Sequence, residues 1–509
     1  MPNTADPDGP QPRAAGGYAE SGGGHTDVLR RAAELALEYL GRLPERPVGA
    51  RAAGDELRAT LGGPLPDRGD DPRKVIEQLA IDADPGIVAS AGPRYFGFVV
   101  GGSHPVALAA DWLVGAWDQN AGLFVAGPAA AVVEEVAGRW LAELFGIGGR
   151  PVSAGFTTGA TMANLTGLAA GRHHVLAAAG WDVEASGLYG GPELNVVVGG
   201  EVHATVGLAL QYLGLGRDRV HRVDVDGQGV MRPDALARVL DGLSGPTLVS
   251  AQVGNVASGA CDPIREIAAL TTAGGAWLHV DGAFGLWAAA APERRHLVDG
   301  LELADSWATD AHKWLNVPYD CGVVLCAHPE SHAAATGVAA PYLVQSGGLD
   351  HDPMGWVPEA SRRARGVPVY ATLRTLGREG IAELVERCCR QASRMAARLD
   401  AHPAVTVLNE VVLNQVAFRC APAGVSDDVA DAATRSVIAA VQGDGTCWLG
   451  GTIWHGHAAV RVSFSNWSTS DADVDQSADA ILAAVDRITA SDSSFSAPGT
   501  TAADALRGS

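Results

Sequence analysis

From about residue 107 to residue 348, stretches with helical spacing of apolar residues alternate with short, apolar, β-rich runs. The segment Pro128–Leu144, for example, places its apolar residues on one broad face, as an amphipathic helix does. The predicted strands are Leu194–Val198, Val220–Val223, Thr247–Gln252, Trp277–Val280 and Gly322–Cys326. Strands that alternate with helices form a mostly parallel sheet covered on both faces. The pattern therefore predicts a large α/β domain over residues 107–348.

The pattern changes on both sides of this domain. Residues 26–106 contain short helical stretches, predicted at Thr26–Leu43, Arg51–Leu61 and Pro72–Ile81. Downstream, a long helix at about Tyr370–Leu399 precedes short strand-like runs at Val405–Leu408, Gln415–Arg419, Trp448–Ile453 and Ala458–Ser463. We therefore expect an N-terminal helical segment over 26–106 and a smaller α+β domain over 349–490. The ends, 1–25 and 491–509, are rich in small and polar residues and are predicted to be disordered.

Composition narrows the class of protein. The chain has 509 residues, 47% of them hydrophobic and 19% charged, which is enough to bury a large core. Its net charge of −21 argues against a nucleic acid or an anionic membrane as partner, because either would repel it. No run of 18 apolar residues and no signal peptide is present, so we expect a cytoplasmic protein. The seven cysteines show no CxxC pairing and are best explained as reduced thiols, and we find no metal-binding constellation.

Lysine is almost absent from this chain. Of 37 basic residues only Lys74 and Lys313 are lysines, and the others are arginines. An arginine cannot act as a nucleophilic amine, because its guanidinium stays protonated. Lys313 lies shortly before the Gly322–Cys326 run, where its amine could form an imine with an aldehyde cofactor. A purely structural lysine is the alternative, and the surrounding motifs decide between the two.

Three further features accompany Lys313. Asp281 follows the Trp277–Val280 strand, where a carboxylate could pair with a pyridinium nitrogen, and the small Ala283 would leave room for a flat ring. The turn Gly159-Ala160-Thr161 opens a helix, whose first amides favour an anion such as phosphate. His203 follows another predicted strand and could stack on an aromatic cofactor. Each feature alone is common in proteins, but their combination is specific.

In this combination the sequence resembles the group II pyridoxal-phosphate-dependent amino-acid decarboxylases, the family of the aromatic amino-acid, tyrosine and glutamate decarboxylases. The resemblance runs from about Arg94 to Asn466 and is carried by FTTGATMANL (156–165), Glu201–Gly216, HVDGA (279–283) and DAHKW (310–314). It implies an aspartate aminotransferase-like fold of type I with pyridoxal 5'-phosphate as cofactor. It also implies a homodimer whose active sites are shared between the subunits.

The resemblance assigns roles to individual residues. Lys313 would hold the cofactor as a Schiff base, and Asp281 would pair with the pyridine nitrogen. Ala283 and His203 would enclose the ring, with His203 on the side of the substrate. The other implied cofactor-binding residues are Gly159, Ala160, Thr161 and His312 at the phosphate and Asn255 near the ring hydroxyl.

The residues that contact the substrate are less clearly marked. In the aromatic amino-acid decarboxylases a loop tyrosine delivers the Cα proton, but the corresponding stretch here, Leu349–Trp356, contains none. His351 is the candidate replacement, and Tyr342 lies nearby in sequence. The other candidate substrate-binding residues are Asn120 in a polar segment, Phe98, for which core packing is the alternative, and Arg461, which could grip a carboxylate. Arg362, Arg363 and Arg365 are expected to form surface or dimer ion pairs instead.

The implied activity is decarboxylation of an L-amino acid to an amine and CO₂, through an external aldimine and a quinonoid. The missing loop tyrosine keeps a second hypothesis open, in which the same cofactor supports decarboxylation-dependent oxidative deamination, aldol-type chemistry or transamination. A third is a catalytically silent binder of the cofactor, which the retention of Lys313 in a lysine-poor chain disfavours. The sequence does not specify which amino acid is the substrate.

Overall fold

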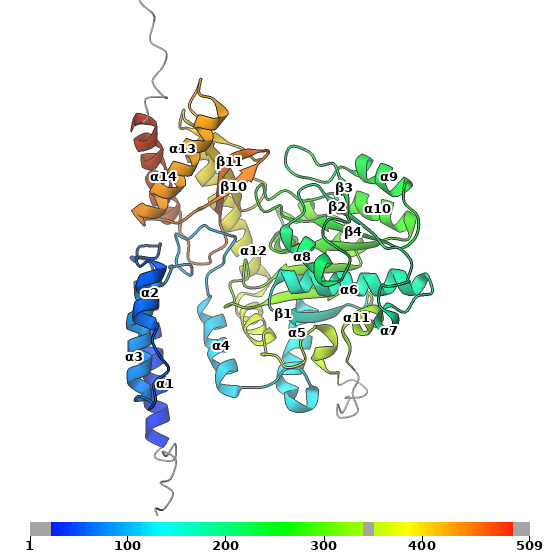
Figure 1. The fold of residues 1–509 in the computed structure, drawn as a ribbon, viewed down its shortest axis with the longest axis horizontal. Coiled ribbons are helices and arrows are strands. Elements are labelled where there is room, and N and C mark those ends of the chain that lie inside the picture. The colour runs from blue at the N-terminus through cyan, green and yellow to red at the C-terminus, as the bar shows by residue number, and fades with distance from the viewer. Residues whose placement is uncertain (1–21, 339–350, 492–509) are drawn as a thin grey trace, which may run out of the picture. The chain divides into compact units, whose positions relative to one another are not determined.

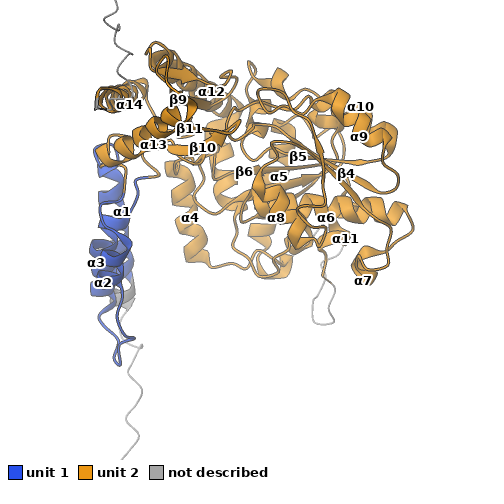
Figure 2. Cartoon of the chain, turned by 45° about the horizontal axis from the view of Figure 1, so that its top comes forward, with its two compact units in different colours: residues 1–46, 50–89 blue, residues 47–49, 90–509 orange. Residues whose placement is uncertain are grey.

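The computed structural model describes residues 22–338 and 351–491. The chain divides into two compact units, residues 1–46 with 50–89 and residues 47–49 with 90–509 (Figure 2). In the first unit, α1 (Gly22–Arg42) and α2 (Gly54–Leu61) each contact α3 (Pro72–Ala83). The helix α1 starts inside the 1–25 segment expected to be disordered, and most of that segment lies outside the described residues.

The second unit is built on a seven-stranded sheet with the strand order β1-β7-β6-β5-β4-β2-β3 (Figure 1). Its strands are β1 (Ser153–Thr157), β2 (Asn195–Gly199), β3 (His221–Val223), β4 (Thr247–Gln252), β5 (Trp277–Asp281), β6 (Ser306–Asp310) and β7 (Gly322–Cys326). The strands from β3 to β6 pair in parallel, and β7 pairs antiparallel with both β6 and β1. The α/β class with a mostly parallel sheet is therefore confirmed.

Helices cover both faces of this sheet. In β2, Val196 and Val198 belong to an apolar cluster with residues of α6 (Ala160–Ala178) and α8 (Ala204–Tyr212). Val197 points to the other face, where its cluster includes residues of α5 (Pro128–Leu144), α9 (Pro233–Asp241) and α10 (Ile264–Gly274). Successive strand residues face opposite sides, so both sides of the sheet are buried. Two other helices are α7 (Val183–Ser186) and α11 (Pro329–Thr336).

A second, antiparallel sheet has the order β10-β11-β9-β8. Its strands are β8 (Val405–Val407), β9 (Gln415–Cys420), β10 (Gly450–Trp454) and β11 (His457–Ser463), close to the predicted runs. The remaining helices are α4 (Pro105–Trp117), α12 (Gly366–Asp400), α13 (Asp427–Asp444) and α14 (Asp471–Ser491). Gly377 interrupts α12 with φ 61°, a left-handed conformation that suits glycine.

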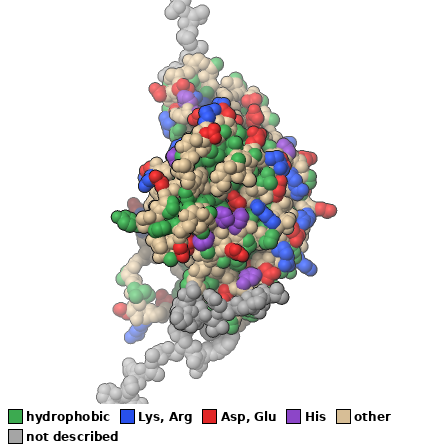
Figure 3. Space-filling view, turned by 90° about the vertical axis from the view of Figure 1, so that its right-hand side faces the viewer, with side chains coloured by type: hydrophobic (Ala, Val, Ile, Leu, Met, Phe, Trp, Pro, Cys, Tyr) green, Lys and Arg blue, Asp and Glu red, His purple; other side chains and the backbone are tan. Residues whose placement is uncertain are grey.

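Three general features of the described residues bear on the class of protein. No helix within residues 22–338 or 351–491 has both the length and the apolar character needed to cross a membrane. All seven cysteines are free thiols, and six of them are buried. Acidic and basic side chains are interspersed on the face seen in Figure 3.

Candidate active site

The predicted chemistry converges at one edge of the parallel sheet. The carboxyl ends of parallel strands lie together at this edge, which is where open α/β sheets bind ligands. A cavity of about 490 Å³ opens there between the ends of β4, β5 and β6 and the start of α6. Of the residues predicted from the sequence, those that line it are Phe98, Gly159, Ala160, Thr161, His203, Asp281, Ala283, His312, Lys313 and Arg461.

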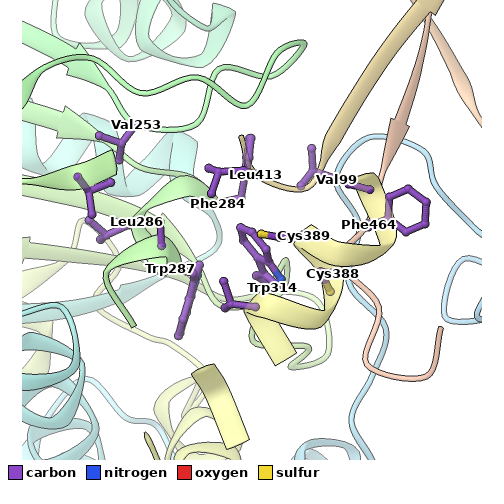
Figure 4. Close-up of a cluster of buried hydrophobic side chains, with 14 of the residues drawn as sticks. Val99, Val253, Phe284, Leu286, Trp287, Trp314, Cys388, Cys389, Leu413 and Phe464 are labelled. Atoms are coloured by element: carbon purple, nitrogen blue, oxygen red, sulfur yellow. The ribbon is translucent and has the colours of Figure 1, made fainter. Parts of the chain in front are cut away.

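Lys313 is held by its neighbours in the chain. Its Nζ lies 2.9 Å from Asp310 Oδ2, and both side chains are largely shielded from solvent. Trp314, the next residue, is fully buried, and its ring lies 6.4 Å from that of Phe284. Figure 4 shows both rings in one apolar cluster with Leu286, Trp287, Cys388 and Cys389. The core therefore anchors the backbone on either side of the cavity-lining residues.

Asp281 and His203 both line the cavity, and each affects the pKa of the other through its charge. The Asp281 side chain is buried and accepts a hydrogen bond from the amide of Ala283 at 3.2 Å. Burial raises the pKa of Asp281, while His203 and Lys313 oppose that rise. Burial lowers the pKa of His203. Because the amide of Thr205 donates to His203 Nδ1 at 3.3 Å, a neutral His203 carries its proton on Nε2.

The predicted phosphate turn is present at the start of α6. Thr158, Gly159, Ala160 and Thr161 all line the cavity at this helix end. Gly322 makes the turn possible, because a Cβ on Gly322 would lie 2.5 Å from Gly159 Cα. His312 lies beside the turn, where Cys321 donates its amide to Nδ1 at 3.1 Å and the ring stacks on Tyr319 at 4.2 Å. Burial lowers the pKa of His312.

The wall around Phe98 is unusual in its backbone. Phe98 and Val99 have φ values of 55° and 56°, in the left-handed region that non-glycine residues seldom adopt. Phe98 is 62% exposed, and its ring lies 5.4 Å from that of Trp448, which in turn stacks on Tyr95 at 5.0 Å. Backbone strain of this kind concentrates at functional sites, where the surrounding structure holds it in place.

Arg461 supplies a positive charge to the cavity. Its guanidinium donates to the carbonyl oxygen of Val256 at 3.2 Å, and no carboxylate among the described residues lies within ion-pair distance of it. Burial lowers the pKa of Arg461. Arginine nevertheless keeps its proton at any physiological pH, so the cavity contains a cation without an acidic partner.

Three predicted site residues do not line the cavity. Asn255 is buried and uses Oδ1 to accept the amides of Ala257 and Ser258 within its own turn. Asn120 is exposed, and its Oδ1 accepts the amides of Gly122 and Arg362. His351 is exposed and lies edge-on to Trp356 at 6.0 Å. Tyr342 lies outside the described residues.

The three arginines after that stretch form ion pairs within the chain. Arg362 is not a surface residue: it is buried and pairs with Glu134 at 2.7 Å and 2.9 Å. Arg363 pairs with Asp111 on α4 at 2.7 Å, and Arg365 pairs with Asp320 at 2.8 Å. These contacts fix the segment that precedes α12.

The structure adds cavity-lining residues that sequence reasoning did not select, notably Thr158, Gln252, Asp310 and Tyr319. Asp310 belongs to the DAHKW motif, and its position three residues before Lys313 could have indicated that it also lines the cavity. Gln252 pairs in register with Asp281 on the neighbouring strand, a relation that only the sheet reveals. Tyr319 reaches the cavity through a loop, which no periodicity predicts.

Comparison with known proteins identifies the family. Residues 55–421 match the model described as the pyridoxal-dependent decarboxylase conserved domain. The chain belongs to the pyridoxal-dependent decarboxylase family. Its members are lyases that act on amino acids with pyridoxal phosphate as cofactor, and the predicted family, enzyme class and cofactor are thereby confirmed.

Relatives of this decarboxylase differ in their reactions. An aromatic-L-amino-acid decarboxylase of Bacillus atrophaeus is 26% identical over 452 residues, covering 86% of this chain and 91% of the relative. A phenylacetaldehyde synthase of Arabidopsis thaliana is 24% identical over 450 residues, covering 84% and 89% respectively. Among solved structures, Oryza sativa TDC with PLP and tryptamine superposes with a TM-score of 0.85 at 22% identity, covering 92% of this chain and 99% of that one. The structural likeness supports the type I fold.

The residues of this decarboxylase suit its cofactor chemically. The cavity offers an amine for an aldehyde, a buried carboxylate for a ring nitrogen and the start of a helix for a phosphate. Ala283, with its short side chain, lines the same cavity as Asp281 and Lys313. The donor set therefore fits pyridoxal phosphate.

Proposed function

We propose that this enzyme removes the α-carboxylate of an L-amino acid as CO₂ and releases the corresponding amine. The observation that carries the proposal is the convergence of Lys313, Asp281 and His203 in one cavity at the ends of parallel strands. When bound, pyridoxal phosphate supplies an aldehyde that takes up an amine and a ring that accepts the electrons of the broken Cα–carboxylate bond.

Four cavity-lining residues are proposed to bind different parts of that cofactor. Lys313 would provide the amine that holds the aldehyde. Asp281 would pair with a protonated ring nitrogen, because a buried carboxylate is stabilised by an adjacent positive charge. Ala283 and His203 would enclose the ring, and with Nδ1 accepting from Thr205 the Nε2–H of His203 would face the substrate.

The phosphate group belongs at the start of α6. The turn residues Gly159, Ala160 and Thr161 present backbone amides and a hydroxyl there, and the helix dipole favours an anion. His312 lies at the same end of the cavity and orients its ring through the Cys321 amide. Asn255 near the ring hydroxyl stays a prediction, and Gln252 reaches the cavity from the adjacent strand.

Arg461 is the proposed partner of the substrate carboxylate. It is the cavity's cation without an acidic partner among the described residues, and a guanidinium binds a carboxylate through two parallel hydrogen bonds. Phe98 and Tyr319 would contact the substrate side chain from the wall of the cavity. Asn120 stays a prediction for this role, since its Oδ1 is engaged by two backbone amides.

A second function is favoured by a specific observation. His351, the predicted proton donor, is exposed and does not line the cavity, and the chain is similar to a phenylacetaldehyde synthase. Without a donor at Cα, the amino acid, O₂ and water would yield an aldehyde, CO₂, ammonia and hydrogen peroxide.

Comparing His351→Gln with Tyr342→Phe distinguishes the two candidate proton donors. The variant that loses the true donor should divert product from amine to aldehyde.

The test is product identification. Purified enzyme with pyridoxal phosphate is incubated under air with each standard amino acid, and products are identified by mass. We expect an amine lighter than its substrate by CO₂, absent with Lys313→Ala. Lys74→Ala, which removes the other lysine, an exposed one on α3, is the matched control and should leave the product unchanged. Aldehyde with peroxide would favour the second function, and equal behaviour of wild type and Lys313→Ala would refute the role of Lys313.

We also propose that the enzyme acts as a homodimer in the cytoplasm. The helices α2 and α3 contain no buried residue, and Leu29, Leu37, Leu79 and Ile81 are all more than half exposed on α1 and α3. On α4, Trp112, Leu113 and Trp117 are also exposed. A second copy of the chain would cover such surfaces. The seven free thiols suit a reducing compartment.

A further inference from the structure

Asp310 occupies a fixed position at the end of β6. Its amide donates to the carbonyl of Ala283 at 2.9 Å, and its own carbonyl accepts the indole N–H of Trp287 at 3.2 Å. Its side chain is only 3% exposed. The backbone is therefore held on both sides, and the carboxylate is aimed into the cavity.

The two oxygens of this carboxylate contact two different parts of the site. Oδ1 accepts the backbone amide of Ala160 at 2.6 Å, and Oδ2 lies 2.9 Å from Lys313 Nζ. His312 Nε2 lies 3.5 Å from Oδ1. The amide of Ala160 belongs to the first turn of α6, where the cofactor's phosphate is proposed to bind. One carboxylate thus links the phosphate turn to the lysine.

We propose that Asp310 is a positioning residue that competes with the cofactor's phosphate for the Ala160 amide while it holds Lys313 in place. This inference rests on the proposed function, which puts the phosphate at this turn and the aldehyde at Lys313. A buried amide N–H cannot serve two anions fully, and two neighbouring negative charges repel each other. A phosphate at this turn would therefore have to displace Oδ1 from the amide, whereas the contact between Oδ2 and Lys313 could remain.

If Asp310 competes in this way, wild type should bind ligands that carry a phosphate more weakly than a variant without this charge does. Asp310→Asn keeps the size of the side chain and an oxygen for the Ala160 amide but removes the charge. We expect it to bind inorganic phosphate at least ~10-fold more tightly than wild type, since one like-charge contact removed shifts affinity by about that factor. Pyridoxal phosphate should gain similarly, whereas pyridoxal, which lacks the phosphate, should gain nothing.

Isothermal titration of the full chain freed of cofactor measures these affinities with inorganic phosphate, pyridoxal phosphate and pyridoxal. Asp310→Ser is the second charge-free variant if Asp310→Asn folds poorly. Asp305→Asn is the matched control, because Asp305 precedes the same strand at its other end, where it pairs with His328. The control should bind phosphate as wild type does.

A gain limited to the phosphate-bearing ligands supports the proposal. Unchanged or weaker binding of inorganic phosphate by both Asp310 variants would overturn it, as would an equal gain for pyridoxal. Borohydride reduction and peptide mass analysis of the wild-type holoenzyme test the proposed function separately. If Lys313 carried no label, the proposed function would fail, while the phosphate titration, which needs no aldehyde, would still decide the role of Asp310.

Discussion

At the scale of single residues, Arg461 offers the sharpest link between structure and specificity. Its guanidinium reaches the cavity without an acidic partner among the described residues. Replacing it with Gln should raise the KM for the amino acid roughly 10- to 100-fold, because a hydrogen bond to a charged group contributes about 1.5–3 kcal/mol. Cofactor content, measured by absorbance, should stay unchanged.

The product amine provides the control for this prediction, because it lacks the carboxylate that Arg461 is proposed to bind. Its inhibition constant should be the same for wild type and Arg461→Gln, and Arg461→Lys should recover part of the loss. A variant that weakened the amine and the amino acid alike would show that Arg461 shapes the cavity rather than binding the carboxylate.

How far single residues could be predicted depended on their chemistry. Lys313, Asp281 and His203 stand in motifs with a distinctive order, and the structure brings them together. Asn255 and Asn120 were selected by position, but their side chains hydrogen-bond to nearby amides instead of lining the cavity. Asn favours such local bonds in turns, and a sequence does not reveal which way the side chain turns.

At the scale of elements, the strands with continuous apolar runs were predicted and two others were not. The strand β6 is fully buried but contains Ser, Thr and Asp, so no apolar run marks it. The strand β1, SAGFT, was also not predicted, because it contains small and polar residues and no apolar run. Both missed strands pair with β7, whose apolar run was predicted correctly. Composition alone therefore missed strands whose polar side chains are buried by neighbours.

The start of β7 lies against the phosphate turn, and this close approach allows a prediction at the scale of elements. A Cβ on Gly322 would lie 2.5 Å from Gly159 Cα, and backbone atoms cannot move aside cheaply. Gly322→Ala should therefore displace the turn, cost about 1–3 kcal/mol of stability and weaken cofactor binding. Gly149→Ala, at a position with no heavy atom within 4 Å, is the control and should match wild type. Thermal melting and cofactor absorbance measure both effects, and normal cofactor content in Gly322→Ala would contradict the argument.

At the scale of the whole molecule, the helices of the first unit bury too little apolar surface to be stable by themselves. Its helices α2 and α3 contain no buried residue, and a helix gains most of its stability by packing an apolar face. The leucines and isoleucine exposed on α1 and α3 therefore need a covering surface, and a second copy of the chain is the proposed one.

Charge placed on that surface should dissociate the dimer. The double variant Leu37→Glu and Leu79→Glu changes residues that are 61% and 52% exposed on α1 and α3. Each leucine loses about 1.5 kcal/mol or more of burial, so the dimer Kd should rise at least roughly 100-fold. Sedimentation velocity measures this, with Leu65→Glu as the control, because Leu65 is an exposed leucine in the connection between α2 and α3 and not on the proposed helix surface. A double variant that sedimented as wild type would place the dimer contact elsewhere, and the exposed tryptophans of α4 would become the next surface to charge.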